Sequence, residues 1–255
     1  DAKGLLPQEI ELRQKQYEYY REKLLTFDTV CDNTHTHTRI VLSNRYFAIL
    51  QEAAEFVGIK QSCVVWKKLG EISIYSKERI STDNLNECNY VGVENLLKDK
   101  LGKTKSSYVP KDGTMIKFCI NDILIGNIRP YLRKIWMADV DGGTNGDVLV
   151  IHIKEDMNKV VLPKYLFQVL LDERFFEYDI KYSKGAKMPR GDKNKILEYK
   201  IPIPSLPVQE YIVSILDKFD VLVNDISQGL PKEIELRQKQ YEYYREKLLD
   251  FKGNN

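Results

Sequence analysis

Basic side chains gather in three short segments of this sequence, and such segments are the parts of proteins that bind phosphate groups. The richest, Lys181–Lys200, contains seven basic residues, two acidic residues and two glycines. The second, Gly126–Lys134, is "GNIRPYLRK", in which Asn, Arg and Tyr can reach base edges as well as phosphates. The third, Lys98–Ser107, is "KDKLGKTKSS". One such segment is usually a solvated surface, but three in one region favour contact with DNA.

The candidate DNA-binding residues in these segments divide by the kind of contact that they can make. We expect the Lys and Arg side chains of the richest segment to contact phosphates, which every DNA sequence presents. Asn127 and Arg129 are better suited to bases, because their side chains match the hydrogen-bonding groups of base edges. The net charge of the chain is only +2, so DNA contact depends on local patches. The full candidate set is Lys103, Lys105, Asn127, Arg129, Tyr131, Arg133, Lys181, Lys184, Lys187, Arg190, Lys193 and Lys195.

A reaction centre is not expected from this sequence. It lacks the phosphate-binding pattern GxxxxGK(S/T), a GxGxxG turn after a strand, and the GxSxG turn that carries a nucleophilic serine. Its three histidines offer little material for acid–base catalysis. Cys31 lies near His35 and His37, but no fourth ligand is evident, and "NTHTHT" is typical of a polar strand or loop. We therefore expect no catalytic residue, no cofactor and no metal site.

The bulk properties indicate a globular cytoplasmic protein. The chain has 255 residues, of which 43% are hydrophobic and 30% charged, so it can bury a sizeable core. No apolar run approaches the ~20 residues that span a membrane, and the first residues do not resemble a signal peptide. The four cysteines are dispersed without a CxxC pair, which is typical of free thiols in a reducing cytosol.

The elements that must position the basic segments include a sequence that occurs twice. "EIELRQKQYEYYREKLL" fills Glu9–Leu25 and, without a change, Glu233–Leu249. In both copies large side chains recur at alternating steps of four and three, the pattern of a coiled-coil seam. The same spacing continues upstream of the second copy. The predicted seam consists of Ile10, Tyr17, Tyr20, Leu24, Ile212, Leu216, Phe219, Val223, Ile226, Ile234, Tyr241, Tyr244 and Leu248.

Between the two copies the patterns predict a mixed α/β domain. Turns are expected at Asp141–Gly143 and Asn145–Gly146, and one helix through Tyr165–Phe176. The predicted division is a helical segment at 1–27, a domain at 28–207 and a second helical region at 208–255. Strands are predicted at the β-rich runs Thr114–Cys119, Asp122–Gly126, Lys134–Ala138 and Asp147–Ile153.

Several of these stretches resemble one known family. The C-terminal limb, "YKIPIPSLPVQEYIVSILDKFDVLVNDISQGLPKEIELRQKQYEYYREKLL", is similar to the conserved region of type I restriction–modification specificity (S) subunits. The stretches that resemble the target-recognition domain of that family are "WKKLGEI" (Trp66–Ile72), "NDILIGNIRPYLRKIWMADVDGGTNGDVLVI" (Asn121–Ile151) and "KGAKMPRGDKNKILEYKIPIP" (Lys184–Pro204). The resemblance covers Trp66–Phe251 and, through the repeat, Leu6–Phe27.

The resemblance implies an α+β fold, in which long conserved helices flank a mixed α/β target-recognition domain and form an antiparallel coiled coil. It implies a subunit without catalytic activity, which reads double-stranded DNA and positions methyltransferase (M) subunits and, through them, restriction (R) subunits. A site for S-adenosylmethionine is not evident, so that cofactor would belong to the partner.

This chain departs from the family plan because it has one recognition domain where members usually have two. Two identical helices need two equivalent partners, so the repeat favours a homodimer in which each protomer reads one half of the target. Half of a two-domain subunit, folded back on itself as a monomer, is the alternative. An assembly protein that docks partners without reading DNA, or the detached domain of a fused restriction–methylation enzyme, also fits the residues.

Overall fold

The computed structural model describes residues 2–26, 64–224, 236, 239–240 and 242–243, with side chains from 11 to 26, from 64 to 221 and at the five later positions. The chain divides into two compact units. One, called here the helical unit, combines Asp1–Leu24 with Ile212–Asn255, and the other, the sheet unit, is Leu25–Tyr211. No helix in the described ranges is long and apolar enough to cross a membrane.

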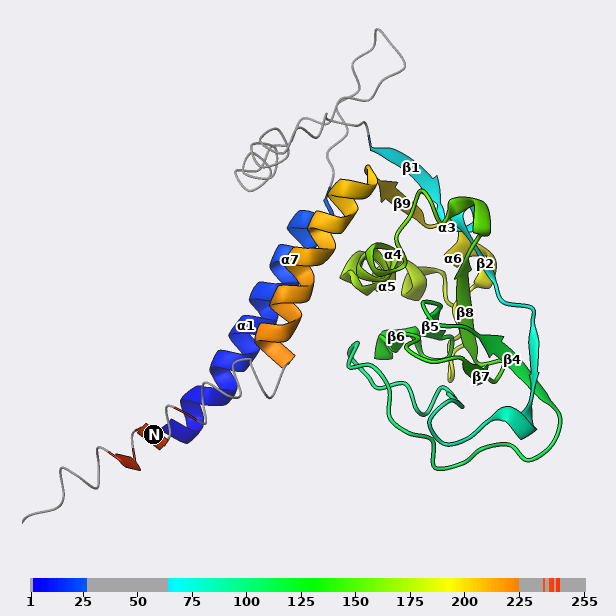
Figure 1. Cartoon of the computed structure of the whole chain (residues 1–255), viewed down its shortest axis with the longest axis horizontal. Helices are drawn as coiled ribbons and strands as arrows, with labels where there is room; N and C mark the ends of the chain where they lie inside the picture. The colour runs from blue at the N-terminus through cyan, green and yellow to red at the C-terminus, as the bar shows by residue number, and fades with distance from the viewer. Residues whose placement is uncertain (1, 27–63, 225–235, 237–238, 241, 244–255) are drawn as a thin grey trace, which may run out of the picture. The chain divides into compact units, whose positions relative to one another are not determined.

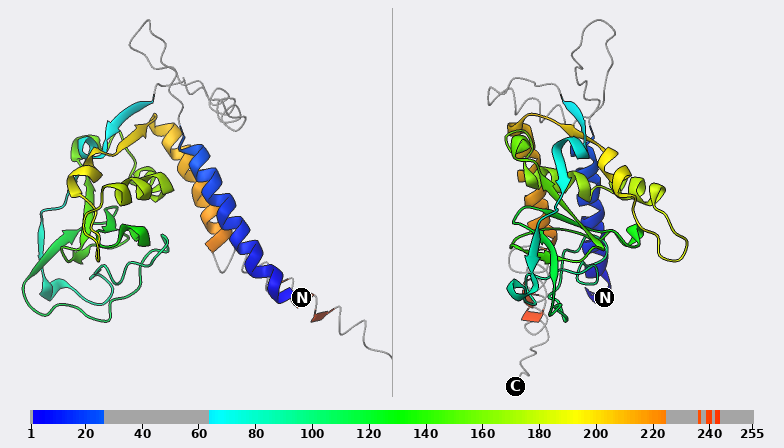
Figure 2. Two further views of the ribbon diagram at one scale, coloured as in Figure 1. Left: turned by 180° about the vertical axis from the view of Figure 1, so that it is seen from behind. Right: turned by 90° about the vertical axis from the view of Figure 1, so that its right-hand side faces the viewer.

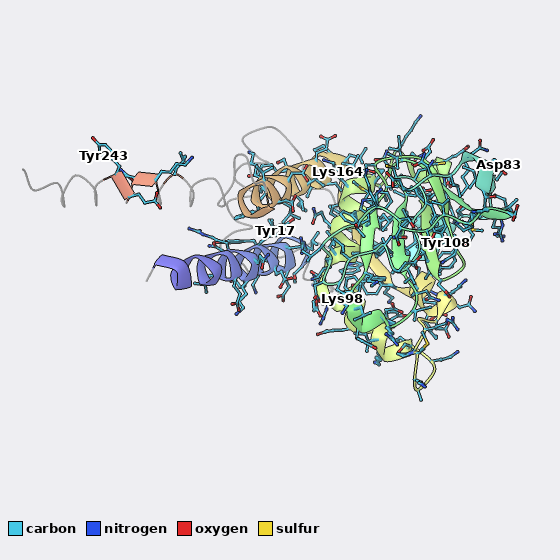
Figure 3. The ribbon with its side chains drawn as sticks, turned by 90° about the horizontal axis from the view of Figure 1, so that it is seen from below. Tyr17, Asp83, Lys98, Tyr108, Lys164 and Tyr243 are labelled. Atoms are coloured by element: carbon cyan, nitrogen blue, oxygen red, sulfur yellow. The ribbon has the colours of Figure 1, made fainter. Side chains whose placement is uncertain are left out.

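Two antiparallel helices build the described part of the helical unit. α1 is Ala2–Leu24, and α7 is Leu206–Asn224, of which the part from Ile212 belongs to this unit. The two helices lie side by side (Figures 1 and 2). The Phe219 ring stacks on the Tyr20 ring at 5.1 Å and on the Tyr17 ring at 6.1 Å between centroids. Figure 3 shows Tyr17 on the side of α1 that faces α7. Ring contacts of this kind stabilise a helix pair beyond the area that they bury.

The predicted coiled-coil seam is described in part. Tyr17, Leu24, Ile212 and Leu216 are buried, and Tyr20 and Phe219 are half-buried. Arg21 is also buried, with its guanidinium 4.3 Å from the centre of the Tyr17 ring. The extended coiled coil stays a prediction, because the side chains of Ile10, Val223, Ile226, Ile234, Tyr241, Tyr244 and Leu248 lie outside the described residues.

Antiparallel strands form the framework of the sheet unit (Figure 1). Within the described residues, a four-stranded sheet has the order β2-β8-β5-β6 and a three-stranded sheet the order β3-β4-β7. β1 and β9 pair separately, with Val65 opposite Ile203. The strands are β1 (Val65–Lys68), β2 (Ser73–Tyr75), β3 (Arg79–Ser81), β4 (Thr114–Phe118), β5 (Ile123–Gly126), β6 (Ile135–Met137), β7 (Gly142–Thr144), β8 (Val148–Ile153) and β9 (Lys200–Ile203).

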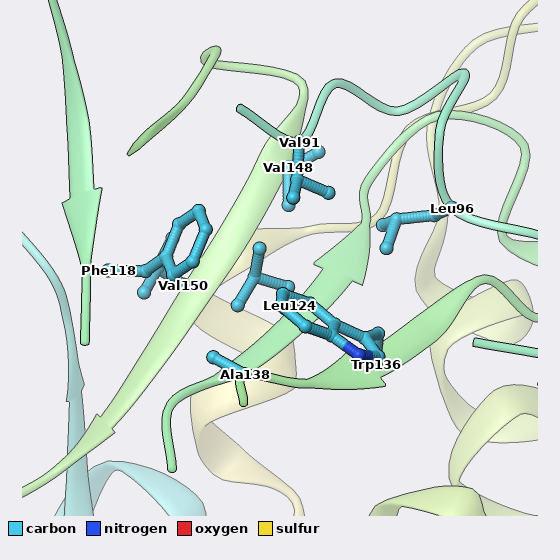
Figure 4. Close-up of a cluster of buried hydrophobic side chains, with 8 residues drawn as sticks. All are labelled: Val91, Leu96, Phe118, Leu124, Trp136, Ala138, Val148 and Val150. Carbon is cyan, nitrogen blue, oxygen red and sulfur yellow. The ribbon is translucent and has the colours of Figure 1, made fainter. Parts of the chain in front are cut away.

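The four strands that the sequence predicts are confirmed as β4, β5, β6 and β8. Every residue of β5 is buried, and so are five of the six in β8, because both faces of these central strands are covered. The Phe118 and Trp136 rings meet edge to face at 5.9 Å between centroids. Figure 4 shows the cluster that packs on one face, formed by Val91, Leu96, Phe118, Leu124, Trp136, Ala138, Val148 and Val150.

The predicted turn at Asp141–Gly143 is wrong, because Gly142 and Gly143 begin the edge strand β7. β7 pairs with β4, with Gly142 opposite Phe118. A β carbon at Gly142 would lie 2.0 Å from the carbonyl oxygen of Asn89 and 2.6 Å from the Phe118 ring. Glycine occupies this position because the Asn89 backbone and the Phe118 ring lie too close to the strand for any side chain.

The single helix predicted through Tyr165–Phe176 is also wrong, because the chain forms two helices there. α4 is Pro163–Leu171 and α5 is Glu173–Tyr182. Between them Asp172 is extended, with φ −65° and ψ 142°, and its carboxylate accepts a hydrogen bond from the Arg174 backbone N–H. An aspartate in this position caps the first turn of a helix, so α5 begins anew at a different angle.

Short helical elements complete the sheet unit. α3 is Leu69–Ile72, and α6 is Lys193–Glu198, with Asp192 as its N-cap, inside the basic segment Lys181–Lys200. Single 3₁₀ turns occur at Thr82–Asn84 (η1), Pro130–Leu132 (η2) and Glu155–Met157 (η3). η2 lies within the basic segment Gly126–Lys134 and positions its side chains.

Candidate nucleic-acid interface

Backbone hydrogen bonds join the basic segment Lys98–Ser107 to the basic segment Gly126–Lys134. The N–H of Asp99 donates to the carbonyl of Leu132 at 3.0 Å, and the N–H of Lys100 donates to the carbonyl of Arg133 at 3.0 Å. Both acceptors belong to the end of η2. The loop around Asp99 therefore lies against the 3₁₀ turn, although 33 positions separate Asp99 from Leu132 in the sequence.

The richest basic segment, Lys181–Lys200, is joined to the residues that come just before η2. The N–H of Arg129 donates to the carbonyl of Pro189 at 2.7 Å, and the N–H of Gly191 donates to the carbonyl of Asn127 at 3.1 Å. The loop also closes on itself, since Lys184 and Arg190 exchange backbone hydrogen bonds of 2.9 and 2.8 Å. The three segments thus form one continuous surface, which we call the basic face, made of residues 98–101, 128–133 and 184–191.

Backbone conformations that non-glycine residues rarely adopt are concentrated in the basic face. Among the described residues, five non-glycine residues have positive φ, and four of them lie here. Such conformations cost free energy and gather at functional sites, where the surrounding structure maintains them. In this face the interlocking hydrogen bonds described above maintain them. The four residues are Asp99 (φ 54°), Lys100 (φ 65°), Arg129 (φ 55°) and Arg133 (φ 48°).

Arg129, Tyr131 and Lys187 are the candidate residues whose side chains extend from the basic face without a partner in the described part of the chain. All three are exposed, Tyr131 to 47%. Met188, at 49%, is exposed between Lys187 and the anchoring Pro189. A long cation and a large ring on a rigid 3₁₀ turn can contact a base or a phosphate without first breaking an internal contact.

Two further cations on the loop make surface ion pairs. Lys184 lies 2.6 Å from Oδ2 of Asp192, and Arg190 lies 3.2 Å from Oδ1 of Asp147. The hydrogen bond from Lys184 lowers the pKa of the Asp192 carboxyl. The exposed pair of Arg190 with Asp147 contributes ~1 kcal/mol or less, so a phosphate can replace that carboxylate at small cost, whereas Asp192 is only 17% exposed and also caps α6.

Most of the other candidate cations are engaged with the protein itself. Nε of Arg133 donates to Glu173 at 2.7 Å, and Nζ of Lys103 donates to the carbonyl of Cys88 at 2.7 Å. The Lys105 ammonium is 3.3 Å from Glu87, and that of Lys195 is 2.8 Å from Glu198. Lys181 lies 5.5 Å from the Tyr182 ring, and Lys193 is exposed on the first turn of α6. Arg133 and Lys103 in particular stabilise the loops that bear the exposed residues.

Asn127 lies beneath the basic face, whereas the sequence predicts that it contacts bases. Its side chain is only 5% exposed, and its Oδ1 has no hydrogen-bond partner among the described residues. Base edges are out of its reach in this conformation. Gly191 of the richest basic segment lies beside it, together with Asp179, a residue that the sequence did not single out. Asp179 shares the apolar face of α5 with Phe175 and Phe176, and a lone acid on such a face is the signal that could have revealed it.

Metal-binding chemistry is not supported by the described residues, which contain no cluster of three His, Cys, Asp or Glu side chains. Cys31, His35 and His37 lie outside them.

Comparison with known proteins agrees with this architecture. Residues 64–236 match the family model described as the type I restriction modification DNA specificity domain. The chain is 27% identical over 263 residues to a type I restriction enzyme specificity subunit of Escherichia coli, in an alignment that covers 96% of this chain and 55% of that subunit. It therefore spans about half the length of that relative. A Mycoplasma pneumoniae specificity subunit is 25% identical over 94% of this chain and 62% of its own.

A solved structure shares the fold. The crystal structure of the type I restriction–modification system S subunit from M. genitalium superposes with a TM-score of 0.52 at 15% sequence identity, over 93% of this chain and 55% of that one. The family model covers more than half of the chain, and it shows that the protein belongs to the type I restriction–modification DNA specificity family.

Proposed function

We propose that this chain is a non-catalytic subunit that reads one half of a bipartite target in double-stranded DNA through its basic face. The observation that carries the proposal is the joining of three distant basic segments by backbone hydrogen bonds into one surface of strained, interlocked loops. Such a surface is rigid, so the side chains on it keep their spacing, as recognition of a sequence requires. In this role the protein works in the cytoplasm and needs no cofactor of its own.

The side chains of the basic face divide the work of binding. Lys184, Lys187 and Arg190 contact phosphates, because they are exposed and the partners of Lys184 and Arg190 are surface carboxylates. Arg129 and Tyr131 contact bases, because both extend from the rigid turn η2. An arginine can donate two hydrogen bonds to one guanine, and a tyrosine ring can pack on a thymine methyl group.

The test is fluorescence anisotropy with a labelled mixture of random-sequence duplexes, each about 20 base pairs long. The triple variant Lys184→Ala, Lys187→Ala, Arg190→Ala is expected to bind all duplexes more weakly. The slope of log affinity against log salt should also fall by roughly one for each phosphate that a removed cation had neutralised.

The matched control for that test is Lys77→Ala, Lys111→Ala, Lys159→Ala, which removes the same charge from exposed positions outside the basic face. If both triple variants bind equally weakly, net charge and not the basic face binds DNA. If the unmodified chain binds no duplex, the alternative role of an assembly-only subunit replaces DNA reading.

The repeated segments support a second part of the proposal, which is a role in assembly. Leu12 and Tyr19 are 64% and 50% exposed, and their counterparts in the second copy, Leu236 and Tyr243, are 55% and 56% exposed. Each pair is seven residues apart, so each copy presents the same apolar stripe. We infer that the second copy pairs with that of another chain in a homodimer, while the assembled helices dock methyltransferase subunits and, through them, restriction subunits. Such a dimer would read an interrupted, inverted palindrome.

A further inference from the structure

Two buried side chains beneath the basic face end in oxygen atoms that have no hydrogen-bond partner among the described residues. Asp179, on α5, is 1% exposed, and both of its carboxyl oxygens are unpaired. Asn127, which follows β5, is 5% exposed, and its Oδ1 is unpaired. Buried polar atoms without partners are rare because each costs free energy, so two side by side require an explanation.

The unpaired oxygens of Asp179 and Asn127 both lie close to Gly191. A β carbon placed on Gly191 would lie 2.4 Å from Oδ1 of Asp179 and 2.9 Å from Oδ1 of Asn127. Gly191 is also the residue whose N–H donates to the carbonyl of Asn127. It lies between Arg190 and the helix cap Asp192, so the two oxygens meet where the basic loop joins the rest of the sheet unit.

Among the described residues, the charged and titratable groups around this point offer Asp179 no cation. On β2, the hydroxyl of Tyr75 donates to the carbonyl of Lys193 at 2.8 Å, and burial, followed by Asp179 and Asp192, raises the pKa of that hydroxyl. Asp192 is occupied by Lys184 at 2.6 Å and by the N–H groups of α6. Burial raises the pKa of Asp179 itself to about 7. A carboxyl group in such surroundings holds its proton more readily than one in water.

We propose that Asp179 and Asn127 are a positioning pair, in which the protonated carboxyl of Asp179 donates a hydrogen bond to Oδ1 of Asn127 across the α carbon of Gly191. This bond ties α5 to the end of β5 directly under the loop that carries Lys184, Lys187 and Arg190. Residue 191 must lack a side chain, because a β carbon would separate the two oxygens. The hydrogen bond itself is independent of the proposed function, and its effect on DNA binding rests on that function.

The first test compares the thermal unfolding of the full chain with that of Asp179→Asn and Asp179→Ala. An asparagine at 179 donates to Asn127 at every pH, whereas aspartate donates only while protonated. Between about pH 5 and 7 the folded state keeps the proton and the unfolded state has released it, so stability falls as pH rises. The melting temperature of the unmodified chain should fall relative to Asp179→Asn by roughly 3 °C per pH unit and level off above about pH 7.

Asp179→Ala should melt below Asp179→Asn at each pH, because Oδ1 of Asn127 then has no donor. A pH-independent difference between the unmodified chain and Asp179→Asn would overturn the proposal. The proposal would also be overturned if the melting temperature of the unmodified chain rose with pH relative to that of Asp179→Asn. In that case an ionised Asp179 would accept a hydrogen bond from the amide of Asn127 in the opposite orientation.

The second test asks whether the pair positions the loop, with the same labelled duplex mixture. Gly191→Ala changes no charge, yet it should weaken binding about tenfold, equivalent to ~1.4 kcal/mol, because it displaces both oxygens. The matched control is Gly146→Ala, where a β carbon meets nothing within 4 Å.

The outcomes separate the two proposals. If the lysine and arginine substitutions weaken binding but Gly191→Ala does not, DNA reading stands and the positioning role falls. If the pH dependence is found but no variant and no unmodified chain binds DNA, the hydrogen bond stands and the DNA-reading function falls.

Discussion

Arg129 and Arg133 lie at the two ends of one 3₁₀ turn, both with positive φ, but their side chains have different surroundings. Arg133 is directed to Glu173 on α5, so it connects the turn to a helix. Arg129 is exposed, and its backbone N–H donates to the carbonyl of Pro189 in the basic segment Lys181–Lys200. The same residue type therefore serves structure at one end of the turn and is available for recognition at the other.

Replacing Arg129 with Ala is expected to weaken binding to the preferred duplex by about 1–3 kcal/mol, a factor of about 5 to 150, and binding to random duplexes much less. The reason is that a base contact carries discrimination, whereas phosphate contacts do not. The preferred duplex would first be selected from a random pool, and then measured against duplexes with one base pair changed.

Arg133→Ala is the matched control for Arg129→Ala. It should keep the discrimination between duplexes and lower the unfolding free energy by ~1 kcal/mol or less, since the pair with Glu173 is partly exposed. Discrimination that survives Arg129→Ala and disappears with Arg133→Ala would contradict this assignment of roles.

At the scale of elements, β7 is held in place by the absence of side chains. Its two glycines allow the strand to lie against Asn89, Phe118 and Ile80, and the Thr144 hydroxyl donates to the buried carbonyl of Val91. The Val91 N–H in turn donates to the Gly143 carbonyl at 3.0 Å. β7 thereby connects the three-stranded sheet to the hydrophobic cluster around Phe118.

Gly142→Ala is expected to lower the unfolding free energy by about 1–3 kcal/mol, because the new methyl group overlaps a backbone carbonyl that cannot rotate away. Urea denaturation measures this, with Gly146→Ala as the control at an open position. Equal unfolding midpoints for the two variants would show that β7 can shift without cost.

Across the whole molecule, the two copies of the repeat share an exposed face at positions that the structure describes in both. In the first copy Tyr17 is buried and stacks on Phe219, a residue upstream of the second copy. The described side chains of the second copy, at Leu236, Lys239, Gln240, Glu242 and Tyr243, are all exposed. Their counterparts Leu12, Lys15, Glu18 and Tyr19 in the first copy are exposed as well, so both copies present this face to solvent.

Light scattering is expected to give a mass near twice 29.8 kDa for the unmodified chain at micromolar concentration. Leu236→Asp with Tyr243→Asp should reduce the mass to that of one chain, because two charges would enter the apolar stripe. Leu12→Asp with Tyr19→Asp makes the same change in the same local sequence of the first copy and should leave the dimer intact. A monomer in all three cases would identify this chain as half of a two-domain reader.

Features that depend on near neighbours in the chain could be predicted from the sequence. Alternating and continuous apolar runs defined β4, β5, β6 and β8, because strand periodicity involves residues only two apart. The repeat and the three basic segments were equally visible. The patterns failed at Gly142 and at Asp172, since a close backbone approach and a helix cap depend on atoms that a period along the chain does not specify.

Which of the basic residues share one surface, and which of them face outward, depends on long-range packing. The contacts of Asp99 with Leu132 and of Arg129 with Pro189 depend on the path of the chain between them, which no local period encodes. The same path buried Asn127 beside Asp179, because the loop at Gly191 folds over both. The residue types set which contacts each side chain can make. Long-range packing then decides whether that side chain is exposed on the basic face or buried beneath it.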